Sequence, residues 1–167
     1  GQAGESGETP ASVRSDTVVE LACNVDDMTG EELGFALERL LEAGALDVWL
    51  TPIHMKKTRP AVTLSVLARP EDGERLSRQL LAETSTFGVR RRLWERDVAE
   101  RESRQVSTPW GSVRVKAKLL DGRVVEISPE YEDCARLSRA AGASLRRIYQ
   151  AAARGWREAE GAESQSP

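Results

Sequence analysis

The stretch that decides the fold is residues 18–44, VVELACNVDDMTGEELGFALERLLEAG. It begins with residues 18–23, a short apolar run with β-branched side chains that is typical of a strand. Thr29 is followed three residues later by Glu32, which is the spacing of a capping box at the start of a helix. Apolar residues then recur at helical spacing as far as Gly44, a residue type that often ends helices. This stretch therefore predicts a strand, an acidic turn and an amphipathic helix.

The residues that follow complete a recognisable order of elements. Strands are predicted at residues 46–55 and 61–68, and the basic loop KKTRP at 56–60 joins them. A helix follows, residues 84–88 break it, and the charged stretch 89–98 is interpreted as a fourth strand. The order β-α-β-β-α-β is the split βαβ pattern of ferredoxin-like domains. We therefore expect an α+β fold with a ferredoxin-like sandwich.

The rest of the sequence predicts a smaller unit of β-hairpins and helices. Apolar and basic residues alternate strictly over residues 113–119, which predicts a half-buried strand. Turn signals flank it at 109–111 and 121–122. Ser128 followed by proline predicts the start of one helix, and Ser144 predicts the start of a last one.

Four segments are therefore expected along the chain. Residues 1–16 are small and polar, and we expect a flexible lead-in there. Residues 17–103 form the ferredoxin-like domain, and residues 104–157 form the β-hairpin and helical unit. Residues 158–167 resemble the lead-in in composition and are expected to be a flexible tail.

The composition excludes several classes of protein. The 167 residues are 40% hydrophobic and 31% charged, which is typical of a soluble globular domain. No apolar run approaches the roughly 20 residues of a membrane span, and we expect no membrane partner. A net charge of -3 and an aromatic content of 5% disfavour a nucleic-acid binder, which needs basic and stacking side chains. The two distant cysteines, Cys23 and Cys134, exclude a disulfide framework and fit a cytoplasmic protein.

The predicted topology brings three loops to one edge of the sheet. In a ferredoxin-like sheet with strand order 4-1-3-2, the loops at residues 24–30, 55–60 and 84–88 emerge on the same side. The first loop carries paired carboxylates, the second carries lysines and an arginine, and the third carries hydroxyls. Together these groups predict a site for a triphosphate and its divalent cation.

Each loop also has a simpler interpretation. Asp26 and Asp27 suit a hard cation such as Mg²⁺ or Mn²⁺, but they could be ordinary turn residues. Lys56, Lys57 and Arg59 suit phosphate oxygens, but a charged hairpin tip is often only solvated. The hydroxyls of the third loop could belong to an ordinary helix exit. The expected convergence of the three loops favours the joint site.

Two more groups of charged residues lie outside these loops. Arg114, Lys116 and Lys118 are expected on one face of a strand, where they could bind an anion or simply face solvent. Glu130 and Asp133 crowd the first turn of the predicted helix, where the helix dipole alone favours acidic residues. Either group could also contact a ligand.

A dedicated nickel site is not expected within one subunit. His54 is the only histidine, and it could be a nickel ligand, a proton shuttle or a polar residue at a strand end. Tight nickel sites normally need several imidazole or thiolate ligands. If nickel is handled, another segment, subunit or substrate must supply ligands.

Five motifs are distinctive when taken together: NVDDMTGEEL at 24–33, PIHMKKTRP at 52–60, ETSTFGVR at 83–90, GSVRVK at 111–116 and PEYEDC at 129–134. In this order they resemble the LarC family of nickel-insertion proteins, and the resemblance extends from about residue 18 to about residue 153. It departs from the family at Thr58, Ala61 and Ser85, where the family commonly has asparagine, glycine and threonine.

The resemblance implies a carboxyl-terminal, CTP-binding and oligomeric domain of such a protein. LarC-type proteins insert nickel into pyridinium-3,5-bisthiocarboxylic acid mononucleotide, which yields the nickel-pincer cofactor of lactate racemase. They consume CTP together with a divalent cation, Mg or Mn. The expected partners are this precursor nucleotide, the amino-terminal LarC domain and further copies of the chain. The alternative is a nucleotide-sensing or scaffolding module without catalysis.

The matching motif positions give the candidate site residues. We assign the divalent cation to Asp26 and Asp27. We assign the nucleotide to Lys56, Lys57, Arg59, Thr84, Thr86, Arg90, Lys116, Glu130 and Asp133. No residue is assigned as catalytic.

Overall fold

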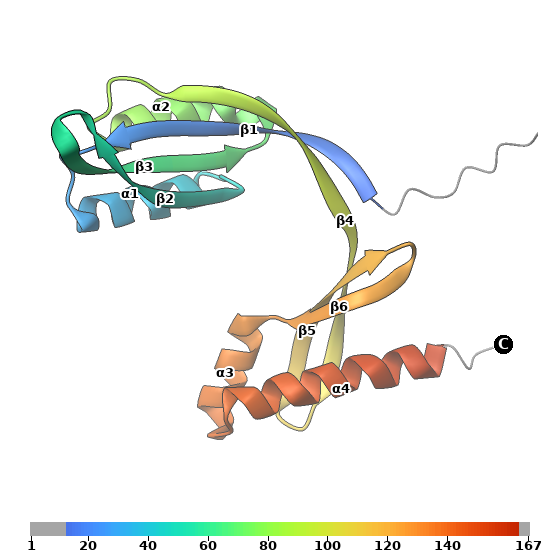
Figure 1. Cartoon of the computed structure of the whole chain (residues 1–167). Coiled ribbons are helices and arrows are strands. Elements are labelled where there is room, and N and C mark those ends of the chain that lie inside the picture. Colours follow the sequence, from blue (N-terminus) through green and yellow to red (C-terminus); the bar gives the residue numbers. More distant parts are fainter. Residues whose placement is uncertain (1–12, 164–167) are drawn as a thin grey trace, which may run out of the picture. The chain divides into compact units, whose positions relative to one another are not determined.

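The computed structural model describes residues 13–163, which fold into two compact units (Figure 1). The first unit is Ser15–Asp97, and the second consists of the described residues from Val98 onward together with Val13 and Arg14. The division falls inside one long strand, β4 (Arg90–Thr108). The sequence places this boundary between residues 103 and 104, whereas the contacts within the chain divide it between residues 97 and 98.

The first unit has the predicted order of elements. They are β1 (Val13–Val25), α1 (Gly30–Glu42), β2 (Asp47–Met55), a 3-10 turn (Lys56–Thr58), β3 (Arg59–Ala68), a second 3-10 turn (Pro70–Asp72), α2 (Gly73–Glu83) and the first part of β4. The strands lie in the order β2-β3-β1-β4. This is the predicted 4-1-3-2 arrangement, and the α+β ferredoxin-like prediction is confirmed.

The helix after β1 begins as its capping box predicts. The backbone N–H of Thr29 donates to Oε2 of Glu32 at 2.7 Å, and the N–H of Glu32 donates to Oγ1 of Thr29 at 3.2 Å. Buried α1 residues, such as Leu33 and Leu40, pack with buried residues of β1, β3 and α2 in one hydrophobic core. Gly44, at φ +93, takes the left-handed conformation just after the helix. The acidic turn at residues 26–29 is therefore fixed between a buried strand and a capped helix.

Within the described residues of the first unit, one face of the sheet has no helix packed on it. Alternate residues of β1, including Leu21 and Cys23, are fully buried in the core with α1 and α2. Their neighbours Glu20 and Asn24 point to the opposite side, because successive side chains of a strand alternate. Figure 1 shows both helices on the same side of this sheet. We call the other side the helix-free face.

The second unit is built around the later part of β4. It continues through β5 (Gly111–Leu120), β6 (Arg123–Pro129), α3 (Tyr131–Ala141) and α4 (Leu145–Glu163). The predicted alternation of β5 is confirmed, since its valines are buried and Arg114, Lys116 and Lys118 are exposed. The valines pack against α3 and α4, and Trp156 of α4 is 1% exposed.

The predicted helix start at Ser128 is wrong. Ser128 and Pro129 end β6, where they pair with Lys116 and Val115 of β5. The helix begins at Tyr131 instead, with Glu130 at its N-cap. Proline is tolerated at both places, because neither a helix start nor the edge of a sheet needs its missing N–H.

The predicted flexible ends are too long. Residues 13–16 belong to β1, and Asp16 there accepts hydrogen bonds from Arg96 at 2.9 and 2.7 Å. Residues 158–163 belong to α4. The remaining parts of the predicted lead-in and tail, residues 1–12 and 164–167, lie outside the described residues. The helices within the described range are too short or too polar to span a bilayer.

Candidate functional site

The acidic turn contacts the basic loop. Nη1 of Arg59, at the start of β3, lies 3.6 Å from Oδ2 of Asp26. Asp26 directly follows β1, so this ion pair joins the end of β1 to the connection between β2 and β3. Both side chains remain partly exposed, at 58% for Arg59 and 28% for Asp26, and they remain accessible to a ligand.

The acidic turn also contacts the loop after α2. The hydroxyl of Ser85 donates a short hydrogen bond to Oδ1 of Asp27. The backbone N–H of Ser85 donates to Sδ of Met28 at 3.4 Å. The three loops therefore meet at one end of the sheet, as the predicted topology requires. The sequence did not single out Ser85 as a contact, although it lies between the two threonines that were predicted.

Thr84 and Thr86 shape the third loop. The hydroxyl of Thr84 donates to the carbonyl of Leu80 at 2.7 Å, which satisfies one acceptor at the end of α2. The hydroxyl of Thr86 donates to the carbonyl of Gly88 at 3.0 Å. Both hydroxyls thus stabilise the loop itself, and their role as nucleotide contacts stays a prediction.

Cys23, which interacts with Thr84 and Thr86 of this loop, has a pKa set mainly by its burial. Burial raises the pKa of the Cys23 thiol, although the Thr84 hydroxyl and the charge of Arg90 oppose the shift. Cys23 is fully buried in the hydrophobic core. A buried thiol with a raised pKa is a structural residue rather than a nucleophile.

Asn24 connects the acidic turn to β3 and β4. Its Oδ1 accepts hydrogen bonds from Oγ1 of Thr63 at 3.0 Å and from Nη2 of Arg90 at 2.9 Å. The amide therefore orients Arg90, which is one of the predicted nucleotide contacts. Sequence reasoning missed Asn24 and Thr63. Their position opposite each other in the β1–β3 register explains the contact.

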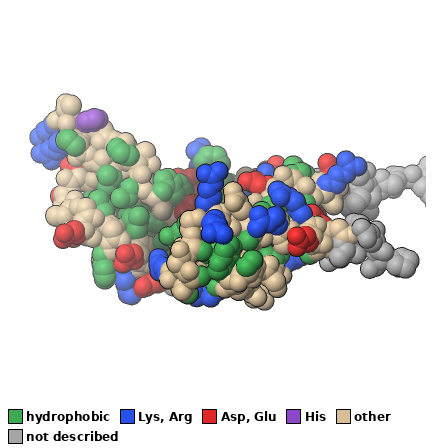
Figure 2. Space-filling model, turned by 90° about the horizontal axis from the view of Figure 1, so that it is seen from below, with side chains coloured by type: hydrophobic (Ala, Val, Ile, Leu, Met, Phe, Trp, Pro, Cys, Tyr) green, Lys and Arg blue, Asp and Glu red, His purple; other side chains and the backbone are tan. Residues whose placement is uncertain are grey.

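The basic loop is backbone-strained and exposed. Lys57 and Thr58 have φ values of 60 and 58, in the left-handed backbone region that residues other than glycine rarely adopt. Figure 2 shows Lys and Arg side chains beside the chain's single histidine at this tip. Within the described residues, Lys56 and Lys57 have no carboxylate partner. Their positive charge is therefore available to an anion.

Lys116, Glu130 and Asp133 form a cluster of their own in the second unit. The backbone N–H and the Nε of Arg114 donate to Oδ2 of Asp133 at 3.0 and 2.9 Å. Hydrogen bonds from the guanidinium and then from the backbone N–H lower the pKa of Asp133 to about 2. Nζ of Lys116 forms a close ion pair with Glu130. These contacts tie α3 to β5, and their predicted contact with a nucleotide stays a prediction.

The acidic turn alone does not make a complete metal site. Across the described residues, no three His, Cys, Asp or Glu side chains form a group that could hold a metal ion. Asp26 and Asp27 provide hard oxygen atoms that fit Mg²⁺ or Mn²⁺. Such a cation would take its remaining ligands from a phosphate group or from water, as nucleotide-bound cations do.

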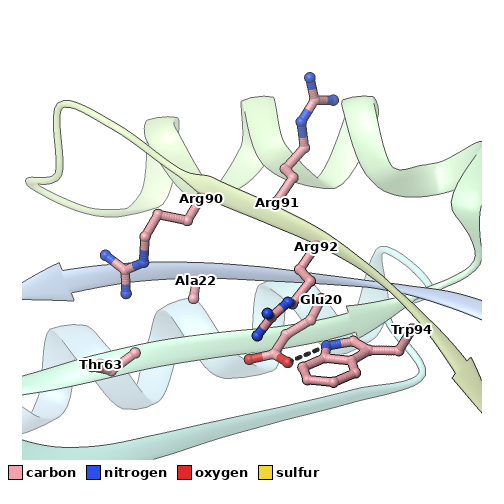
Figure 3. Close-up of a pocket in the computed structure, with 7 residues that line it drawn as sticks. All are labelled: Glu20, Ala22, Thr63, Arg90, Arg91, Arg92 and Trp94. Carbon is pink, nitrogen blue, oxygen red and sulfur yellow. Dashed lines mark hydrogen bonds between the residues drawn. The ribbon is translucent and has the colours of Figure 1, made fainter.

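A cavity of about 370 Å³ opens on the helix-free face of the first unit. It is lined by Glu20, Ala22, Thr63, Arg90, Arg91, Arg92 and Trp94 (Figure 3). Sequence reasoning identified only Arg90 here. A charged strand gives no signal of the side chains that another strand will place beside it, so the pocket was missed.

Known proteins resemble this chain over most of its length. Residues 6–149 match the family model described as nickel insertion protein. The chain belongs to the nickel insertion protein family. Among curated members of the family, a putative nickel insertion protein of Roseiflexus castenholzii is 44% identical over 147 residues, which are 88% of this chain and 37% of the relative.

The name of a second curated relative includes a nucleotide substrate. The pyridinium-3,5-bisthiocarboxylic acid mononucleotide nickel insertion protein of Lactiplantibacillus plantarum is 44% identical over 138 residues, which are 83% of this chain and 33% of the relative. This chain therefore spans about a third of the length of the curated relatives that it matches.

Two solved structures share the fold of this nickel insertion family member. LarC2, the C-terminal domain of a cyclometallase involved in synthesis of the NPN cofactor of lactate racemase, has 42% identity and a TM-score of 0.79. The match covers 85% of this chain and 98% of LarC2. A Methanopyrus kandleri protein has 25% identity and a TM-score of 0.64, with 84% of this chain and 89% of that chain covered.

Proposed function

We propose that this chain binds CTP with a divalent cation at the rim formed by its three loops. CTP hydrolysis there serves the insertion of nickel into pyridinium-3,5-bisthiocarboxylic acid mononucleotide. The observation that carries the proposal is the pair of contacts from the acidic turn, Asp26 with Arg59 and Asp27 with Ser85. They bring carboxylates, cations and hydroxyls together from three separate loops.

The basic loop is suited to the phosphates. Lys56 and Lys57 are exposed, and they have no carboxylate partner in the described part of the chain. Arg59 already faces Asp26, so it would neutralise phosphate charge while it stays close to the cation site. Strained backbone is costly and is concentrated at functional sites. The left-handed conformation of Lys57 therefore supports a binding role for this loop.

Asp26 and Asp27 would hold the divalent cation, Mg or Mn. Two carboxylates are few for a protein-only site but sufficient for a cation that also binds phosphate oxygens. When bound, this cation neutralises the charge of the triphosphate. The contacts of Asp26 with Arg59 and of Asp27 with Ser85 would hold the carboxylates in place, which lowers the cost of ordering them.

The proposed reaction is cleavage between the α and β phosphates. A water oxygen, or a group of the substrate, attacks the α phosphorus, and the bond to the bridging oxygen breaks. Pyrophosphate leaves with the bonding electron pair. Attack by water gives CMP and releases a proton to solvent. Attack by a substrate group instead leaves CMP bonded to that group, and CMP is released when water later displaces it. Lys56, Lys57 and Arg59 would stabilise the charge that develops on the leaving pyrophosphate.

Nickel is a substrate of the proposed reaction, and this chain supplies few groups that favour it. His54 is exposed at the end of β2, and both cysteines are buried. The thiocarboxylates of the precursor, and ligands from the amino-terminal domain of the family, would therefore hold the ion. We propose that domain and further copies of this chain as partners in the cytoplasm.

Calorimetric titration with CTP, ATP, GTP and UTP, each with and without Mn²⁺, tests the proposal. We expect the tightest binding for CTP with Mn²⁺, followed by release of CMP and pyrophosphate when the amino-terminal domain and substrate are present. Binding without turnover under those conditions would indicate a nucleotide-sensing or scaffolding module. Absence of nucleotide binding would overturn the proposal.

A further inference from the structure

The cavity on the helix-free face carries an excess of positive charge, because Arg90, Arg91 and Arg92 line it together with a single carboxylate, that of Glu20. Arg90 donates to the neutral amide of Asn24, and the guanidinium of Arg92 lies 4.6 Å from the centre of the Trp94 ring. Neither arginine has a carboxylate within ion-pair distance among the described residues. Two cations beside a cavity of about 370 Å³ favour an anionic ligand of small-molecule size.

The aromatic wall of the cavity is held in place. Nε1 of Trp94 donates to Oε2 of Glu20 at 2.7 Å, and Arg92 lies over the ring. Figure 3 shows Arg92, Trp94 and Glu20 gathered together, with Arg90 pointing along the same side toward Thr63. The indole is thus prepared for contact with a flat ring, and the Glu20 carboxylate beside it favours a ring that carries positive charge.

We infer that this cavity binds the acid-bearing pyridinium mononucleotide that receives nickel. The inference rests on the proposed function, because that function supplies the substrate. A pyridinium ring is flat and cationic, which suits Trp94 and Glu20. Its carboxylate-type groups and its phosphate are anionic, which suits the guanidinium groups of Arg90 and Arg92. The cytosine base of CTP is neutral, so the base itself offers neither guanidinium group an anionic partner.

Arg90 links the cavity to the turn that carries part of the proposed CTP site. Arg90 lines the cavity, and its guanidinium is hydrogen-bonded to Asn24, two residues before Asp26. A ligand in the cavity would therefore lie close to the triphosphate at the rim. This placement would let a group of the substrate reach the α phosphorus, which is one of the two proposed attacks.

Arg91 provides a matched control. It borders the same cavity and carries the same charge, but Figure 3 shows its guanidinium on the opposite side of β4 from Arg92. Substitution of either arginine by glutamine changes the net charge equally. Only Arg92→Gln removes a cation that faces the Trp94 ring.

The test uses pyridinium-3-carboxylate mononucleotide (nicotinic acid mononucleotide) and its carboxamide as probes. Calorimetry on the full chain is expected to show that the acid binds about tenfold more tightly than the amide, as loss of one charge-assisted hydrogen bond implies. Arg92→Gln should abolish this preference, while Arg91→Gln keeps it. The indole N–H resonance of Trp94, assigned with Trp94→Phe, should shift when the acid is added.

Equal binding of acid and amide, or an equal effect of Arg91→Gln and Arg92→Gln, would overturn the inference. So would an indole resonance of Trp94 that does not respond to the acid. Binding of CTP with Mn²⁺ separates this inference from the proposed function. If CTP binds but the acid does not, only the inference fails. If the acid binds with the expected preference but CTP does not bind, the inference about the cavity is supported and the proposed use of CTP fails.

Discussion

Oδ2 of Asp26 lies 3.6 Å from Nη1 of Arg59, although a helix, a strand and a turn separate the two residues in sequence. The pair joins the turn after β1 to the loop between β2 and β3. A surface ion pair of this kind stabilises a fold by less than about 1 kcal/mol. Its importance is therefore in position: it keeps a carboxylate and a guanidinium together at the rim where Ser85 contacts Asp27.

Replacement of Lys57 should weaken nucleotide binding without unfolding the chain. Lys57 is exposed and has no ion pair in the described residues, so Lys57→Ala removes only a charge available to phosphate. We expect the Kd for CTP with Mn²⁺ to rise about tenfold or more. Lys118→Ala, an exposed lysine of β5, is the control. An unchanged Kd for Lys57→Ala would remove the basic loop from the site.

Relief of backbone strain at Thr58 should stabilise the first unit. Thr58 is β-branched and has a φ of 58, which is unfavourable for such a side chain. Thr58→Asn places a residue that tolerates this conformation, and we expect the free energy of unfolding to rise by about 1 kcal/mol. Urea denaturation measures it. Thr51→Asn, in the extended strand β2, should bring no gain, and a gain of equal size there would contradict the strain argument.

The Arg114–Asp133 contact should stabilise the second unit in a pH-dependent way. The folded-state pKa of Asp133 is lowered to about 2 from 3.8, so its contribution is complete above the higher value and is lost as pH falls toward the lower one. At pH 7, Asp133→Asn should lower the free energy of unfolding by about 1–2 kcal/mol.

Urea denaturation at several pH values checks this prediction for Asp133. The difference between the wild type and Asp133→Asn should shrink between pH 4 and pH 2, as the wild-type carboxylate becomes protonated. Glu132→Gln, an exposed neighbour in the same helix turn, should change stability little at any of these pH values. A difference for Asp133→Asn that is constant with pH would contradict the assigned cause.

Two glycines of α4 should respond to alanine in opposite directions. A Cβ at Gly155 would lie 3.1 Å from the carbonyl oxygen of Ser107 and 3.2 Å from Cβ of Val106, so Gly155→Ala should destabilise by about 1–3 kcal/mol. A Cβ at Gly161 would have open space around it, so Gly161→Ala should stabilise by about 0.5–1 kcal/mol. Thermal unfolding followed by circular dichroism measures both. Stabilisation by Gly155→Ala would show that α4 does not approach β4 this closely.

Local signals in the sequence predict much of this fold. The capping box at Thr29 and Glu32 is visible within a few residues, and the alternation that buries Val113 and Val115 is equally local. The order of strands follows from general rules of handedness. These features position the three loops, which explains why their convergence could be predicted.

What the sequence could not predict depends on contacts between distant strands. β4 carries charges on both faces, so nothing in it reveals that Trp94 meets Glu20 or that Arg90 meets Asn24. Pro129 is equally compatible with a helix start and a strand end, and pairing with Val115 of β5 decides between them. The cavity on the helix-free face was missed because the sequence of β4 does not reveal which residues of other strands lie beside its side chains.

The affinity of the wild type and of Asp27→Asn for CTP, measured by calorimetry with and without Mn²⁺, tests the central claim most directly. Asparagine can still accept the hydrogen bond from Ser85, so the substitution removes the charge and leaves the loop contact in place. With Mn²⁺, the Kd of Asp27→Asn should exceed that of the wild type by about tenfold or more, whereas Asp121→Asn should match the wild type. Without Mn²⁺ the Asp27→Asn effect should disappear. Equal affinities of wild type and Asp27→Asn in the presence of Mn²⁺ would contradict a cation-bound triphosphate at this rim.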